Sequence, residues 1–139
     1  DEMLDRFEGF HYLTDYIQLR RKEIEEYNRR TGADPDQFVN GRRMTNIGVF
    51  RAYVQAYLKN NQALHKDMTL LVRQLAPSQY GLPMEIYCFT RDTDLTAFES
   101  VQADIFDHIL AVLPQFDLRI FQNPTGKGIV GVTEEISKD

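Results

Sequence analysis

Residues 81–126 place a strand-like segment, an amphipathic helix pattern and a second strand-like segment in order, with almost no spare sequence between them. The first apolar segment is 84–89, and the last is 118–122. Between them, five apolar side chains are spaced as on one face of an α-helix: Phe98, Val101, Ile105, Ile109 and Val112. Pro114 cannot lie deep inside that helix. A helix held this closely between two strands has to pack against the sheet they form.

The sequence before residue 81 also predicts strands and a helix. A helix is predicted from about 46 to 60, with Asn46 as its expected cap, on the apolar stripe Ile47, Phe50, Val54, Tyr57 and Leu58. Residues 68–75 alternate as a half-buried strand does, and the turn at 77–81 predicts an antiparallel hairpin with 84–89. A short strand is predicted at 42–45.

The resulting order is strand, helix, strand, strand, helix, strand, which is the ferredoxin-like βαββαβ arrangement of the α+β class. Its two helices should cover one face of a mostly antiparallel sheet. A helical lead-in is predicted from residue 2 to about 30, ended by Gly32 and Pro35. We therefore expect three parts: a lead-in and linker at 1–40, the ferredoxin-like domain at 41–126, and a tail at 127–139.

Composition excludes several classes of partner. The 139 residues carry a formal net charge of -5, which argues against binding to nucleic acid or to anionic lipid. Cys88 is the single cysteine, so one chain cannot build a disulfide or a cysteine-based zinc site. No apolar stretch approaches the ~20 residues that cross a bilayer, and we expect the chain as given to be soluble. Its start at Asp1, inside a helical pattern, indicates a piece of a longer protein.

One pair of residues invites an enzymatic interpretation. Asp104 and His108 lie one helical turn apart, and a carboxylate can orient an imidazole for proton transfer. No nucleophile or oxyanion donor accompanies them, so a half-buried histidine beside a surface aspartate is the preferred interpretation and a hydrolase is the alternative. The glycine-containing segment 123–128 lacks the first glycine and the hydroxyl residue of a phosphate-binding loop. We predict no catalytic, cofactor-binding or metal-ligating residues.

The sheet face opposite the helices is predicted to be open. Tyr87, Phe89 and Phe121 are candidates for that face, where apolar side chains mark a partner surface if they are contiguous. We predict these three residues, with Asp104 and Asp107 on the helix, as a partner or subunit surface. The alternative is a free-standing sensor that binds a small ligand on the open face.

Four motifs, in order, resemble one family. They are GRRMTNIGVFRAY at 41–53, HKDMTLLVRQL at 65–75, GLPMEIY at 81–87 and QADIFDH at 102–108. Together they resemble the cytoplasmic region of bacterial small-conductance mechanosensitive (MscS) channels, in the miniconductance YbdG-type branch. The resemblance extends over about residues 1 to 126.

The resemblance implies a homo-oligomeric channel, heptameric in the family, in the bacterial inner membrane. Such a channel opens under membrane tension in hypoosmotic shock and releases ions and small solutes. This chain would then be part of its cytoplasmic vestibule, acting in assembly, solute filtering and gating modulation. The membrane segments would lie upstream of Asp1, and neither a cofactor nor enzymatic activity is implied.

Overall fold

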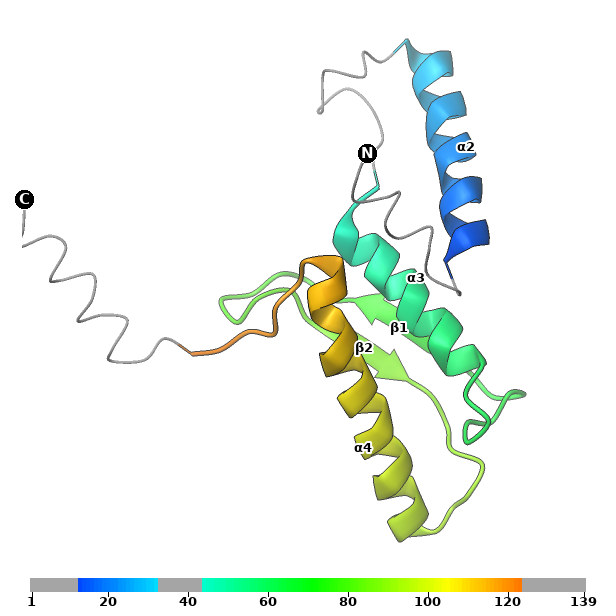
Figure 1. Cartoon of the computed structure of the whole chain (residues 1–139), viewed down its shortest axis with the longest axis vertical. Coiled ribbons are helices and arrows are strands. Elements are labelled where there is room, and N and C mark those ends of the chain that lie inside the picture. The colour runs from blue at the N-terminus through cyan, green and yellow to red at the C-terminus, as the bar shows by residue number, and fades with distance from the viewer. Residues whose placement is uncertain (1–12, 33–43, 124–139) are drawn as a thin grey trace, which may run out of the picture.

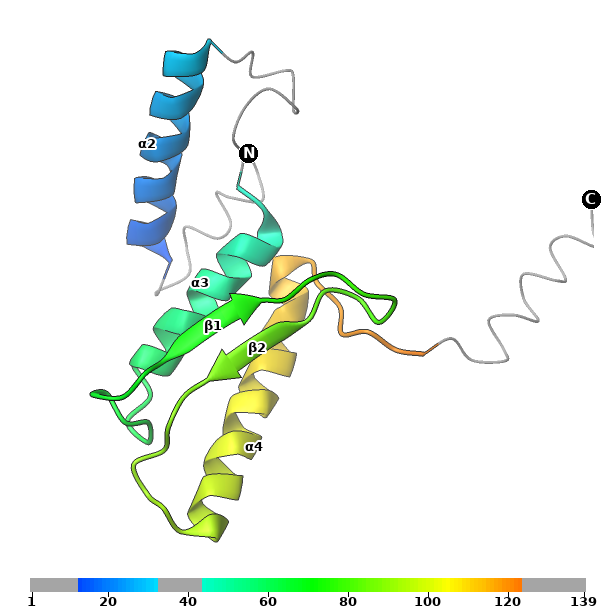
Figure 2. The ribbon, with the colours of Figure 1, turned by 180° about the vertical axis from the view of Figure 1, so that it is seen from behind.

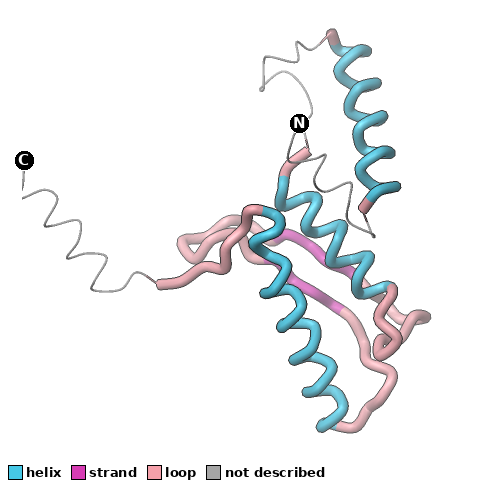
Figure 3. Tube along the Cα trace, viewed as in Figure 1, coloured by secondary structure: helices cyan, strands magenta, loops and turns pink. Residues whose placement is uncertain are grey.

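The computed structural model describes residues 13–32 and 44–123. Its elements are, in chain order, α2 (Thr14–Thr31), α3 (Asn46–Lys59), β1 (Leu71–Gln74), β2 (Met84–Tyr87), α4 (Leu95–Val112) and the 3-10 helix η1 (Leu113–Phe116). Figure 1 shows them in space, and Figure 3 colours the same view by secondary structure. This arrangement confirms the predicted α+β class and is consistent with a ferredoxin-like domain that follows a helical lead-in.

β1 and β2 form the antiparallel hairpin that the sequence predicted. Leu71 is opposite Tyr87 and Gln74 is opposite Met84. The chain reverses between the strands where Ser78 and Gly81 exchange backbone hydrogen bonds of 2.9 and 3.1 Å. Gly81 has a φ of 99°, a backbone conformation that residues with a Cβ rarely adopt, which explains why glycine occupies this turn.

The two longer helices of the domain lie on one face of the hairpin, as predicted. Figure 1 shows α3 and α4 side by side in front of the strands, and Figure 2, seen from behind, shows the strands with no described element covering their other face. Their apolar stripes and the inward face of the hairpin meet in one core, whose buried members are Leu13, Ile17, Val49, Phe50, Val54, Leu58, Leu64, Val72, Ile105 and Phe116.

The cap of α3 is Thr45, one residue before the predicted cap, Asn46. Thr45, with extended backbone, precedes the helix, and its hydroxyl accepts a hydrogen bond from the Gly48 N–H at 3.1 Å. The Asn46 side chain accepts from the neighbouring Ile47 N–H at 3.0 Å and donates to the Phe116 carbonyl at 3.0 Å. Thr45 is therefore the cap, and Asn46 ties the start of α3 to η1.

The strand predicted at 42–45 is absent from its two described residues, 44 and 45. Residues 42–43 lie outside the described residues, while Met44 and Thr45 form no strand. Thr45 instead serves the helix that follows, because its hydroxyl satisfies one of the first-turn amides.

α4 is longer at its start than its apolar stripe predicted. Asp94 caps it by accepting from the Ala97 N–H at 3.2 Å. At the other end the chain tightens into η1, with Pro114 in its first turn, where the missing N–H has no cost. η1 brings Phe116 into the core, with its ring centroid 5.2 Å from that of Phe50.

The last predicted strand, 118–122, is absent. After η1, Asp117 adopts a left-handed conformation with φ of 57°, and residues 118–123 continue without regular structure. Strand geometry requires a ladder partner, and no described strand lies beside this segment. Its Phe121 ring packs against Tyr80 at the hairpin turn instead, at 5.7 Å between centroids.

The helical lead-in is confirmed over its second half. α2 ends at Gly32, whose left-handed φ of 67° lets its N–H bond back to the last turn, as the sequence predicted. Residues 1–12 of the predicted lead-in, and Pro35 beyond it, lie outside the described residues.

Candidate functional site

His108 bonds to α3 and not to its neighbour Asp104. Its Nε2 lies 2.8 Å from the Tyr53 hydroxyl, and its ring stacks on Tyr57 at 4.0 Å between centroids with 12° between the planes. No hydrogen bond or ion pair joins His108 to Asp104 in the part of the chain that the structure describes. The half-buried histidine is therefore used to join α4 to α3.

The cluster of Tyr53, Tyr57 and His108 includes neither of the two aspartates of α4. Asp104 and Asp107 are exposed on α4, away from the imidazole contacts. Among residues 13–32 and 44–123, no group of three histidine, cysteine or acidic side chains is placed to hold a metal ion. What the geometry provides is an aromatic contact between two helices.

The three aromatic residues predicted to share a surface, Tyr87, Phe89 and Phe121, lie at two separate positions. Tyr87 and Phe89 contact each other edge to face at 5.3 Å, and the Arg73–Glu85 ion pair of 2.7 Å spans the two strands nearby. Phe121 lies against Tyr80 at the hairpin turn and makes no ring contact with the other two. A single aromatic patch of these three residues is therefore not formed.

A larger apolar feature was not predicted. A groove of about 840 Å³ lies between α3, α4, the hairpin turn and residues 118–121. We call it the α4 groove, and its apolar walls include Phe50, Leu82, Met84, Ile86, Phe106, Leu110, Leu113 and Ile120. One signal for it was present in the sequence: Phe106 and Leu110 are apolar yet lie off the main stripe of α4.

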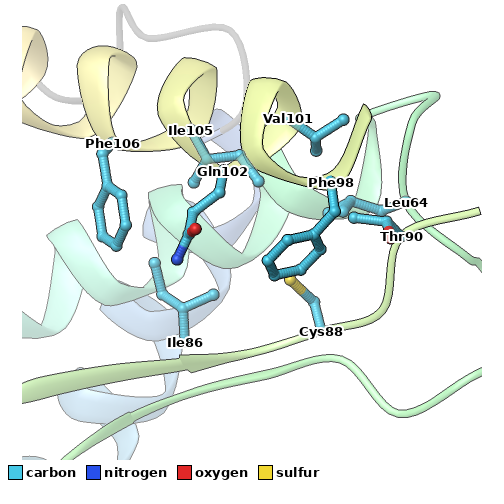
Figure 4. A pocket seen from close by; sticks show the side chains of 9 residues that line it. All are labelled: Leu64, Ile86, Cys88, Thr90, Phe98, Val101, Gln102, Ile105 and Phe106. Carbon is cyan, nitrogen blue, oxygen red and sulfur yellow. The ribbon is translucent and has the colours of Figure 1, made fainter. Parts of the chain in front are cut away.

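A smaller cavity of about 150 Å³ lies under the first half of α4, beyond the end of β2. Figure 4 shows the Cys88 sulfur directed toward the Phe98 ring, and the Gln102 amide reaching down toward Ile86. Burial raises the pKa of the Cys88 thiol, because the thiolate would lose its hydration there. The thiol is therefore held in its neutral form, which is unreactive.

These features define an α+β domain with an apolar groove beside α4, in which His108 joins α4 to α3. None of the described helices is both long and apolar enough to span a membrane.

The family follows from the sequence of this same domain. Residues 45–120, more than half of the chain, match the family described as mechanosensitive ion channel MscS, C-terminal. The match begins at the cap of α3 and includes β1, β2, α4 and η1. The chain belongs to the MscS family of mechanosensitive channels, as part of the cytoplasmic C-terminal domain, and channels of this family are oligomers. No solved structure matches the chain.

Proposed function

We propose that residues 41–126 form part of the wall of the cytoplasmic vestibule in a homo-oligomeric mechanosensitive channel of the YbdG-type branch. The family match over residues 45–120 carries this proposal. The channel would be a heptamer in the bacterial inner membrane, joined to it through segments upstream of Asp1. It would open under membrane tension during hypoosmotic shock.

The domain would act in assembly, in solute filtering and in modulation of gating, without enzymatic activity. The acidic excess of the chain lies outside this wall, because eight basic and eight acidic residues balance within residues 41–126. Exposed Asp104 and Asp107 on α4 are the proposed acidic members of a partner or subunit surface, with Tyr87 and Phe89 at one aromatic place and Phe121, at the hairpin turn, as a separate one.

Survival of hypoosmotic shock tests the proposal in cells. The native-length gene is expressed in bacteria that lack mechanosensitive channels of their own, and the cells are shifted abruptly to dilute medium. We expect survival with this gene and death with a matched gene that ends before residue 41. Equal survival with both would contradict a role for this domain, and death with both, at normal membrane expression, would contradict the channel.

The small cavity favours a second candidate, a regulatory module that binds a small ligand. Apolar cavities near 150 Å³ hold molecules about the size of benzene. A ligand there would raise the melting temperature by mass action and slow alkylation of Cys88, the single cysteine. A panel of small aromatic molecules and metabolites that changes neither quantity would remove the support for this candidate.

A further inference from the structure

The free edge of β2 offers main-chain groups to another strand. The Leu75 N–H donates to the Pro83 carbonyl at 2.9 Å, which fixes the alternation of the ladder. Met84 and Ile86 therefore occupy the pairs whose N–H and C=O groups point away from β1. Both residues are half-buried, and no hydrogen bond links these outward groups to another described residue. An edge of this kind accepts an added strand.

α4 leaves apolar side chains exposed beside the β2 edge. Phe98, Phe106 and Leu110 are 40%, 52% and 46% exposed. An occupant of this edge would therefore be favoured if it carried apolar side chains on the face that meets α4.

Residues 118–122 have that composition and no ladder of their own. The segment reads LRIFQ, with Ile120 59% exposed and Arg119 exposed without an ion pair among the described residues. It leaves α4 along the hairpin turn and away from the strands, as Figure 1 shows in orange. Phe121 holds it there by its contact with Tyr80. To reach β2 of its own chain, the segment would have to reverse its direction.

We infer that residues 118–122 of one copy add as a strand to the β2 edge of a second copy, in the channel oligomer proposed above. Ile120 then packs against Phe106 and its neighbours on the α4 side, while Arg119 and Phe121 point to the opposite face of the sheet, because side chains alternate along a strand. The donor segment and the acceptor edge border the same α4 groove but are different segments of the chain, so each copy gives to one neighbour and receives from another. Such a head-to-tail contact closes into a ring when the rotation between copies allows it.

Hydrogen exchange at single amides tests the contact in the full 139-residue chain. Exchange of the Met84 and Ile86 N–H groups is measured over a range of protein concentrations, with sedimentation giving the oligomeric state. The expected result is that both amides exchange about tenfold or more slowly when the chain associates. The amide of Arg73, already paired across the hairpin with Glu85, should not change.

Three results would overturn the inference. Protection of Met84 and Ile86 at every concentration would mean that the edge is covered within one chain. Rapid exchange in a chain that stays monomeric would remove the contact altogether. Association without protection of these amides would move the subunit contact to another surface and leave the proposed channel standing.

Variants of the donor segment separate this contact from general loss of stability. Ile120→Pro removes an N–H from an exposed segment outside every helix and strand, so the melting temperature of the monomer should not fall. It should abolish association, while Ile120→Val, which keeps strand propensity, should retain it. Association of Ile120→Pro at the level of the unchanged chain would contradict the inference.

Discussion

Phe116 and Phe121 lie five residues apart and have opposite environments. Phe116 has no exposed surface, and its centroid lies 5.2 Å from that of Phe50 and 5.3 Å from that of Tyr53. Phe121 is 44% exposed and contacts Tyr80 at 5.7 Å. We expect Phe116→Ala to lower the free energy of unfolding by about 3–5 kcal/mol, because it opens a cavity. Phe121→Ala, measured in the same denaturant titration, should cost below about 1 kcal/mol, and equal costs would contradict the placement of η1.

Thr45 provides a second prediction for a single side chain. Its hydroxyl accepts from the Gly48 N–H, so Thr45→Ala leaves that amide without its cap. The expected loss is about 1 kcal/mol of unfolding free energy, measured from the urea midpoint at unchanged slope. Thr45→Ser keeps the oxygen and is the matched control. If the alanine and serine variants are equally stable, Thr45 is not the cap.

The burial of Cys88 should make its alkylation rate depend on pH differently in the folded and the denatured chain. Because burial raises the pKa of its thiol, alkylation of the folded chain should reach half its maximal rate at a higher pH than alkylation in denaturant. The neutral thiol is favoured in the fold, so its contribution to stability is complete below the ordinary pKa and is lost as the pH rises through the raised one. Alkylation rates at a series of pH values test this, and coincident folded and denatured midpoints would contradict burial of the sulfur.

At the scale of elements, the end of α2 depends on the left-handed conformation of Gly32. A Cβ there meets no atom within 4 Å, so the cost of substitution comes from the backbone alone. Gly32→Ala should destabilise α2 by about 1 kcal/mol, while Gly32→Asn, which tolerates this conformation better, should cost less. Helical circular dichroism during thermal unfolding measures both variants. No difference between them would show that the helix does not end in this conformation.

The helices and the hairpin could be predicted because their signals are local. The stripe from Phe98 to Val112 and the alternation around Val72 specify the buried faces directly, and Pro114 marks the end of α4 correctly. The prediction of a strand at 118–122 was wrong, because the formation of a strand depends on a neighbour distant in sequence. The same limit explains why 68–75 shortens to Leu71–Gln74.

The candidate surfaces were harder to predict than the elements. His108 was expected to be half-buried, and it is, but its partners Tyr53 and Tyr57 lie on another helix and no spacing rule connects them. The α4 groove arises from four segments that only the folded chain brings together. Periodicity shows which residues of one helix share a face; it does not show which faces stay uncovered.

At the scale of the whole molecule, the domain consists of two helices on one face of a hairpin, with an uncovered strand edge beside α4. Its core is built from α3, α4, β1, η1 and the start of α2, so damage to one helix should unfold the domain as a unit. In the proposed channel, that damage should remove vestibule assembly.

Tension-activated current from the native-length protein tests the proposed function most directly. Membrane patches from cells without other mechanosensitive channels are stretched by suction, and current is recorded for the unchanged protein, for Val54→Asp and for Arg51→Asp. Val54 is buried in the core and Arg51 is exposed on the same helix. We predict current from the unchanged protein and from Arg51→Asp, and its loss in Val54→Asp, since a buried unpaired charge unfolds the domain. A well-assembled native-length protein that passes no current under tension would contradict the proposed channel.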